Sequence, residues 1–120
     1  EKHRAIYETV RRANAAAEAI LKPGVPLCEV DKAARQIIED AGYGPNFTHR
    51  LGHFIGLEVH EYGDVSSANT KVAEVGNIFS IEPGIYVEGE VGVRIEDLVL
   101  ITEEGCEILN SFSKELDILE

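Results

Sequence analysis

Apolar residues recur at helical spacing through the first part of the chain. Such side chains return every three or four positions over residues 6–21 and again over residues 30–41. This spacing predicts two amphipathic helices, the first ending before Pro23 and Gly24 and the second ending at Gly42. The apolar positions of the two stripes are Ile6, Val10, Ala13, Ala17, Ile20 and Leu21, and Val30, Ala33, Ala34, Ile37, Ile38 and Ala41.

From Tyr43 onward the pattern changes to glycine, aromatic and β-branched residues, which favour strands. The segments SIEPGIYV (80–87) and VGVRIEDLVLI (91–101) predict a β-hairpin around the loop EGEVG. A turn at Glu104 and Gly105 predicts a further short strand, after which residues 114–120 form a helical turn or fray. Two helices followed by antiparallel strands indicate an α+β fold in one domain over residues 1–120.

The charge of the chain argues against two kinds of partner. There are 22 acidic side chains against 11 basic ones, and the net charge of −11 opposes binding to nucleic acid or to an anionic membrane surface. No apolar stretch approaches the roughly 20 residues that span a bilayer. Cys28 and Cys106 lack metal-binding spacing, so we expect a reducing cytoplasm, with only weak support for a disulfide between them.

The start of the sequence points to a longer protein. The chain contains no methionine and begins with Glu1, a residue too large for ordinary removal of an initiator methionine. A helical pattern is already under way at the first residues, without the cap that usually precedes a helix. We therefore expect the chain to be part of a longer protein.

The predicted hairpin brings two carboxylates together. Strand alternation puts Arg94 and Glu96 on one face of the segment 92–97 and Asp97 on the other. With a loop centred near Glu90, Arg94 would face Tyr86, and Glu82 would lie diagonally from Glu96 on the same face of the sheet. Diagonal neighbours are separated by roughly 7 to 8 Å at their backbones. Carboxylates in apolar surroundings require a cation, which either a divalent metal or Arg94 would supply.

His53 is the better candidate ligand among the histidines. Gly52 and Gly56 bracket it and permit the close backbone approach and unusual torsions that aim an imidazole. His60 shares a pocket with His53 only if the chain turns at Gly56 between them. Taken singly, each histidine is more often a hydrogen-bonded structural residue, and Glu96 could simply form a surface ion pair. The joint pattern favours a metal site.

Three motifs resemble those of the pita-bread metallopeptidases, and specifically the branch of Xaa-Pro dipeptidases and aminopeptidase P. HRLGHFIGLEVHE (49–61) is similar to the family's histidine loop, SIEPGIY (80–86) to its glutamate strand and GVRIED (92–97) to its final strand. The helix pair with KPGV and the turn AGYGP also match. The resemblance implies the C-terminal portion of a catalytic domain with a partial pita-bread fold, in which helices pack on a curved antiparallel β-sheet.

The same resemblance implies a metal site. His53, Glu82 and Glu96 would be three of five ligands for two divalent metal ions in the full-length enzyme, with Glu96 bridging both ions. Manganese is expected, with cobalt or zinc as alternatives. The family's other two ligands are aspartates that precede the first helix, and this chain begins after that point. Four of its own aspartates lie in the second helix, in a loop or on the wrong side of a strand, and none is a convincing substitute: Asp31, Asp40, Asp64 and Asp97.

The implied activity is hydrolysis of the peptide bond that precedes proline, with His60, Glu82 and Arg94 as the catalytic residues. His60 would donate to the developing oxyanion, Glu82 would carry a proton to the leaving nitrogen, and Arg94 would brace the metal shell. His49 and His60 would bind the peptide substrate, with His49 lining the proline pocket. We expect a homodimer of the full-length protein, and an inactive fragment because two ligands are missing.

Some residues depart from the family pattern, and other functions stay open. Phe54 stands where the family often has glycine, and EYGDV follows His60 where a proline-containing run is common. One alternative is a noncatalytic pita-bread module that binds peptides or proteins, against which the retained ligands count. Another is a sibling hydrolase such as methionine aminopeptidase or creatinase, against which Arg94 counts. The third is an α+β domain with incidental acids.

Overall fold

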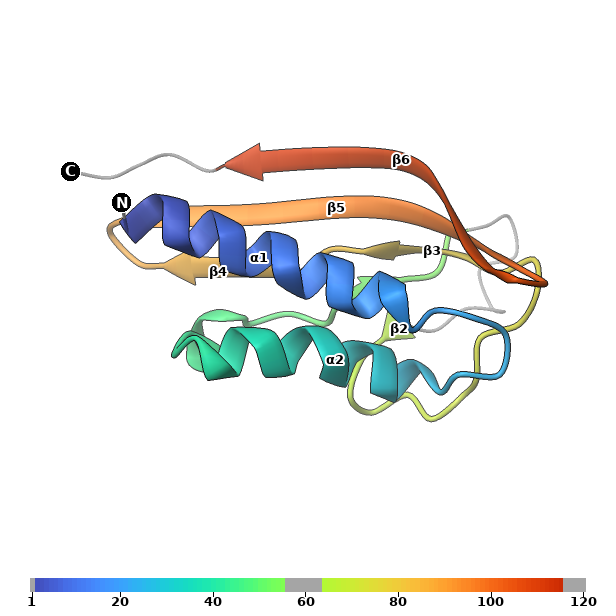
Figure 1. Ribbon diagram of the computed structural model, residues 1–120. Helices are drawn as coiled ribbons and strands as arrows, with labels where there is room; N and C mark the ends of the chain where they lie inside the picture. The colour runs from blue at the N-terminus through green and yellow to red at the C-terminus, as the bar shows by residue number, and fades with distance from the viewer. Residues whose placement is uncertain (1, 56–63, 116–120) are drawn as a thin grey trace.

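The computed structural model describes residues 2–55 and 64–115, and over these residues two helices pack on antiparallel strands (Figure 1). The helices α1 (Lys2–Ala19) and α2 (Leu27–Asp40) are the two that the apolar stripes predict. The chain leaves α2 through Gly42, whose φ of +92° only glycine adopts without strain. A 3₁₀ turn, η1 (Gly44–Asn46), follows.

The main sheet is built around its longest strand, β5. β6 pairs with one edge of β5, and β3 and β4 pair end to end along the other edge (Figure 1). All of these pairings are antiparallel, which confirms the α+β prediction. The strands are β1 (Gly52–His53), β2 (Asp64–Val65), β3 (Ile78–Ile81), β4 (Gly84–Val87), β5 (Val91–Thr102) and β6 (Gly105–Glu115).

The hairpin register differs from the prediction. The loop between β4 and β5 is shorter than expected, because Gly89 at φ +75° closes the turn and Val87 pairs with Val91. Arg94 therefore faces Gly84, and the prediction that it faces Tyr86 is wrong. This change of register gives every residue of the hairpin a different facing partner from the predicted one.

Two further predictions concern the C-terminal part of the chain. β6 is not a short strand, since it follows β5 over most of that strand's length. Lys114 and Glu115 are extended and pair with β5, so a helical turn at these two positions is wrong. The remaining positions of that prediction, 116–120, lie outside the described residues. Cys28 and Cys106 are both free thiols, with no disulfide between them.

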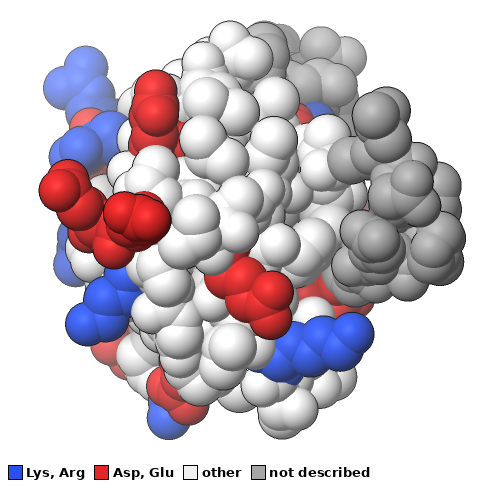
Figure 2. Space-filling model, turned by 90° about the vertical axis from the view of Figure 1, so that its right-hand side faces the viewer, with Lys and Arg blue, Asp and Glu red and all other residues white. Residues whose placement is uncertain are grey.

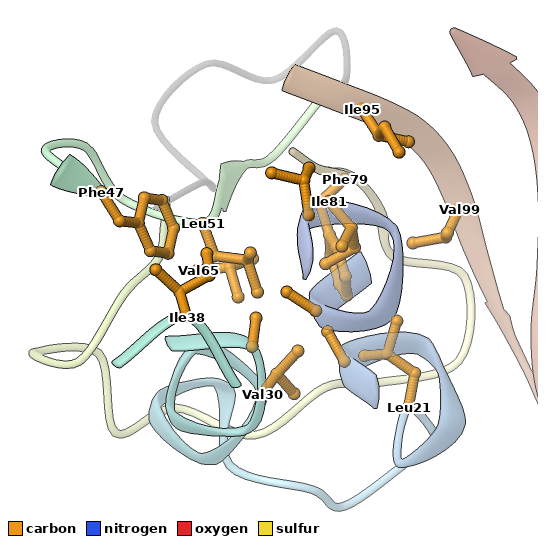
Figure 3. Packing of buried hydrophobic residues seen from close by; sticks show 14 of the residues in the cluster. Leu21, Val30, Ile38, Phe47, Leu51, Val65, Phe79, Ile81, Ile95 and Val99 are labelled. Carbon is orange, nitrogen blue, oxygen red and sulfur yellow. The ribbon is translucent and has the colours of Figure 1, made fainter. Parts of the chain in front are cut away.

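The core lies between the helices and the sheet. α1 packs on β5 and alongside α2, and the labelled side chains of Figure 3 point toward one another from helices, loops and strands. Phe79, the largest of the fully buried side chains, comes from β3. Asn14 of α1 donates a hydrogen bond to the Ile81 carbonyl at 3.3 Å, which ties this helix to the end of β3. This hydrogen bond therefore fixes the C-terminal end of β3 against α1.

The surface carries charges of both signs. Over the described residues that Figure 2 displays, lysine and arginine side chains lie among acidic ones along the left and lower edges, and much of the remaining surface is uncharged. Neither helix in the described part of the chain is long and apolar enough to cross a membrane.

A partly buried pair of acids, Glu18 and Asp97, lies between the sheet and α1. Asp97 points from β5 toward α1 and is only 4% exposed. Burial, followed by a hydrogen bond and the charge of Asp97, raises the pKa of Glu18 to about 9, while a hydrogen bond with Asn14 opposes the shift. Glu18 is therefore protonated at neutral pH, next to the buried Asp97 side chain.

Glu18→Gln should flatten the loss of stability with rising pH. The folded state keeps the Glu18 proton up to about pH 9 and the unfolded state releases it near pH 4.5, so ionisation of Glu18 in the unfolded state lowers stability across that window. The glutamine side chain of the variant does not ionise in this pH window. Thermal unfolding of the intact protein, followed by circular dichroism at several pH values, measures the difference. Glu8→Gln on the exposed face of α1 is the control, and parallel curves for Glu18→Gln and wild type would contradict the prediction.

Candidate active site

The segment that carries His53 runs beside β3. The amide of Glu82 donates to the Leu51 carbonyl at 2.7 Å, and the amide of Ile55 donates to the Ile78 carbonyl at 2.9 Å. β3 thus lies between this segment and β5. His53 is thereby brought to the end of β3, where Glu82 emerges.

Gly52 makes this approach possible. A Cβ atom at Gly52 would lie 1.7 Å from the carbonyl oxygen of Ser80, so no other residue fits without moving the backbone. The close approach predicted for this glycine is confirmed, although its φ is not positive and no unusual torsion is involved. The next residue but one, Phe54, packs its ring on Phe79 at a centroid distance of 5.2 Å, so this departure from the family pattern contributes to the core.

The Glu82 carboxylate is the centre of the site. Its Oε2 atom accepts a hydrogen bond from the Ser80 hydroxyl at 2.6 Å and lies 3.3 Å from the His53 Nε2 atom. Its Oε1 atom lies 3.9 Å from the Arg94 Nη1 atom. The Glu82 side chain is 13% exposed, whereas that of His53 is 45% exposed. A largely buried carboxylate therefore meets a more open imidazole.

Ser80 joins the two candidate ligands. Its hydroxyl oxygen accepts the backbone N–H of His53 at 3.0 Å and at the same time donates to Glu82. The Ser80 side chain is fully buried. One hydroxyl thus fixes the strand of His53 and the carboxylate of Glu82 relative to each other.

Glu96 comes from the neighbouring strand. Ile81 pairs with Asp97, and the next facing positions along the same register are Glu82 and Glu96. The two glutamates are therefore opposite each other, and the predicted diagonal placement is wrong. Glu96 Oε1 lies 3.9 Å from the Arg94 Nη2 atom, so the guanidinium is close to both carboxylates.

Strand alternation separates the functional face of β5 from its buried face. Arg94 and Glu96 are partly exposed on one face, and Asp97 is buried on the other, as the sequence predicts. Among the described residues no three His, Cys, Asp or Glu side chains lie close enough together to hold a metal ion. His53 and Glu82 do converge, and an imidazole with carboxylates suits a divalent transition metal, so the donor set fits part of such a site.

An aromatic wall adjoins the carboxylates. The His49 Nε2 atom lies 3.4 Å from the Tyr86 hydroxyl, and the His49 ring meets the Phe47 ring edge-on at 5.1 Å. Gly84 leaves room for Tyr86, because a Cβ atom there would lie 2.8 Å from its hydroxyl. Burial raises the pKa of Tyr86, while the nearby Arg94 charge lowers it, so the phenol stays protonated at neutral pH.

His60 lies outside the described residues, as does Gly56, at which a turn between the histidines is predicted. Sequence reasoning missed Ser80 and Tyr86 as members of the site. Ser80 offers one signal, since residues two apart in a strand share a face and Glu82 follows it at that spacing. Tyr86 offers none, because its contact with His49 depends on a loop far away in the chain.

A model of metallopeptidase family M24 matches residues 1–103. An uncharacterized peptidase of Staphylococcus haemolyticus is 54% identical over 114 residues, which cover 95% of this chain and 32% of that protein. The chain therefore spans about a third of the length of the curated relatives that it matches.

Solved structures are similar over nearly the whole described chain. The prolidase from Pyrococcus furiosus is 48% identical with a TM-score of 0.86, over 90% of this chain and 32% of its own. The X-Pro aminopeptidase from Thermotoga maritima is 42% identical with a TM-score of 0.85, over 90% of this chain and 31% of its own. These likenesses confirm the partial pita-bread fold, with helices on a curved antiparallel sheet.

Ser80→Ala should weaken metal binding in the full-length protein. The change leaves Glu82 without its shortest hydrogen bond and the His53 amide without its acceptor, and loss of such support lowers metal affinity by about 10- to 100-fold. Titration calorimetry with Mn²⁺ measures the affinity. Ser111→Ala on an exposed part of β6 is the matched control. Equal affinities for Ser80→Ala and the control would show that the hydroxyl is dispensable.

Proposed function

Since this chain belongs to metallopeptidase family M24, we propose that residues 1–120 are the C-terminal portion of the catalytic domain of an Xaa-Pro peptidase, which hydrolyses the peptide bond preceding proline. The observation that carries the proposal is the convergence of His53 and Glu82, with their side chains 3.3 Å apart and Glu96 on the facing strand. The names of the similar solved proteins, a prolidase and an X-Pro aminopeptidase, support the choice of substrate.

Two divalent ions complete the site in this proposal. His53, Glu82 and Glu96 would hold them, with Glu96 shared between both, and the remaining ligands would come from elsewhere in the protein. When bound, the ions supply Lewis-acid activation of water and of the substrate carbonyl. Manganese is the proposed metal. Cobalt and zinc are the alternatives, since affinity alone would favour zinc over manganese.

The residues of this chain then have separate tasks. Glu82 takes a proton from the attacking water and delivers it to the leaving nitrogen, and the Ser80 hydroxyl keeps the carboxylate oriented for both steps. Arg94 offsets the negative charge of the paired glutamates. His60 donates to the oxyanion that develops on the substrate carbonyl.

The aromatic wall suits the proline side of the substrate. A pyrrolidine ring is compact and apolar, and the rings of His49 and Tyr86 offer it a packing surface beside the carboxylates. His49 and His60 are the proposed substrate-binding residues. The partner is therefore a peptide with proline after the scissile bond, and we place the enzyme in the cytoplasm as a homodimer, with neither nucleic acid nor membrane as a partner.

A noncatalytic peptide-binding module is the second candidate. Such a module has no need of a buried carboxylate aimed at an imidazole, and the hydrogen-bonded arrangement around Glu82 therefore favours the enzyme. A peptide that binds without being cleaved, in the presence of Mn²⁺, would reverse this choice.

The full-length protein with Mn²⁺ should hydrolyse Xaa-Pro dipeptides and leave matched Xaa-Ala dipeptides nearly intact, because the aromatic wall fits proline. The 120-residue chain alone should be inactive, since it lacks part of the ligand set. Release of free proline, measured for both proteins under one set of conditions, tests both statements. Ordinary turnover by the isolated chain, or equal cleavage of the two dipeptides, would contradict them.

His60→Ala and Glu96→Ala should separate catalysis from metal binding in the full-length protein. His60→Ala should lower kcat by about 10²- to 10³-fold with metal content unchanged, because it removes an oxyanion donor. Glu96→Ala should lower metal content, because it removes a shared ligand. Elemental analysis beside steady-state kinetics measures both quantities. Loss of metal in His60→Ala, or full occupancy in Glu96→Ala, would refute the respective role.

A further inference from the structure

Arg35 and Asp31 form a partly buried ion pair on α2. The Arg35 Nε and Nη2 atoms donate to the two carboxylate oxygens of Asp31, at 2.9 and 3.1 Å. Asp31 is fully buried, and its pairing one helical turn away from Arg35 compensates the cost of burying a charge. The bidentate contact fixes the plane of the guanidinium group.

The remaining donors of Arg35 reach the loop that follows α2. Nη1 donates to the Phe47 carbonyl and Nη2 to the His49 carbonyl, both at 3.1 Å. The guanidinium carbon also lies 4.1 Å from the centre of the Phe47 ring. A single side chain thus holds both ends of the short segment 47–49 against the helix.

The hydrogen bonds of Arg35 to segment 47–49 connect α2 to the aromatic wall of the site. The buried Phe47 ring, which lies against the guanidinium, packs edge-on against the His49 ring, and His49 in turn reaches the Tyr86 hydroxyl. Neither Arg35 nor Asp31 is a member of the aromatic wall or of the carboxylate cluster. A continuous series of contacts nevertheless links Arg35 on α2 to the His49 imidazole through the Phe47 ring.

We propose that Arg35 is a positioning residue that, held by Asp31, sets where the His49 imidazole lies against Tyr86 and thereby controls how well the proline side of the substrate binds. This inference rests on the proposed function, because His49 meets substrate only there. Arg35 acts through His49 and takes no part in the chemical step.

The geometry of the guanidinium explains why arginine is needed. Its planar fork satisfies one carboxylate and two carbonyl groups at once, whereas the compact ammonium of lysine carries the same charge without that shape. Arg35→Lys therefore keeps the ion pair with Asp31 and loses the two-point hold on the loop. The variant separates charge from position.

Arg35→Lys in the full-length enzyme should raise KM for an Xaa-Pro dipeptide about tenfold, the equivalent of losing one ordinary hydrogen bond, and leave kcat and metal content close to wild type. In a His49→Ala background the same substitution should change KM no further, because the residue through which it acts is absent. Arg11→Gln, which breaks an exposed ion pair on α1, is the control and should leave all three quantities unchanged.

Two outcomes would overturn the proposal. One is an Arg35→Lys effect on KM that persists in full in the His49→Ala background. The other is a parallel fall in kcat and metal content, which would show a general loss of structure.

The proposed function can fail independently of this inference. If the wild-type enzyme leaves Xaa-Pro dipeptides uncleaved, that function is refuted, and NMR of the His49 imidazole then decides the positioning role by itself. A chemical-shift change in Arg35→Lys that is absent in Arg11→Gln would support the role. Identical imidazole spectra for wild type and Arg35→Lys would overturn it.

Discussion

The Glu82 carboxylate has to hold a negative charge at the end of a buried strand, and its neighbours are arranged to stabilise that charge. Ser80 donates to one oxygen, Arg94 lies near the other, and the His53 imidazole lies within 3.3 Å. Each partner comes from a different part of the sheet or its neighbouring segment. The register of these segments and the position of the carboxylate therefore depend on each other.

Because successive side chains of the long strand β5 point to opposite faces of the sheet, the two faces lie in different environments. One face presents Arg94 and Glu96 to the site, and the other buries Asp97 against α1 beside a protonated Glu18. On the buried face Glu18 is held protonated beside Asp97, and on the other face the Arg94 guanidinium lies near both Glu82 and Glu96. The strand thus carries acidic residues on both faces, one beside a cation and one beside a neutral acid.

The loop segment 47–55 connects the second helix to this sheet. Arg35 holds the carbonyl groups of Phe47 and His49 at the start of this segment, and the later part runs along β3, where Gly52 allows backbone contact. Both attachments fall within a few residues of His49 and His53. The loop needs such attachments because neither histidine lies in a long element that would fix it.

The sequence by itself determined both helices, the strand character of residues 80–101, the α+β class and the identity of the motif residues, because periodicity and residue type are local properties. It also placed Arg94 and Glu96 on one face, since strand alternation is local too. Only the tertiary structure decided that Glu82 faces Glu96, that Gly52 is needed for contact with Ser80, and that Arg35 reaches the carbonyl of His49. These facts depend on a turn closed by Gly89 and on segments distant in the chain, and spacing alone does not encode which backbones will meet.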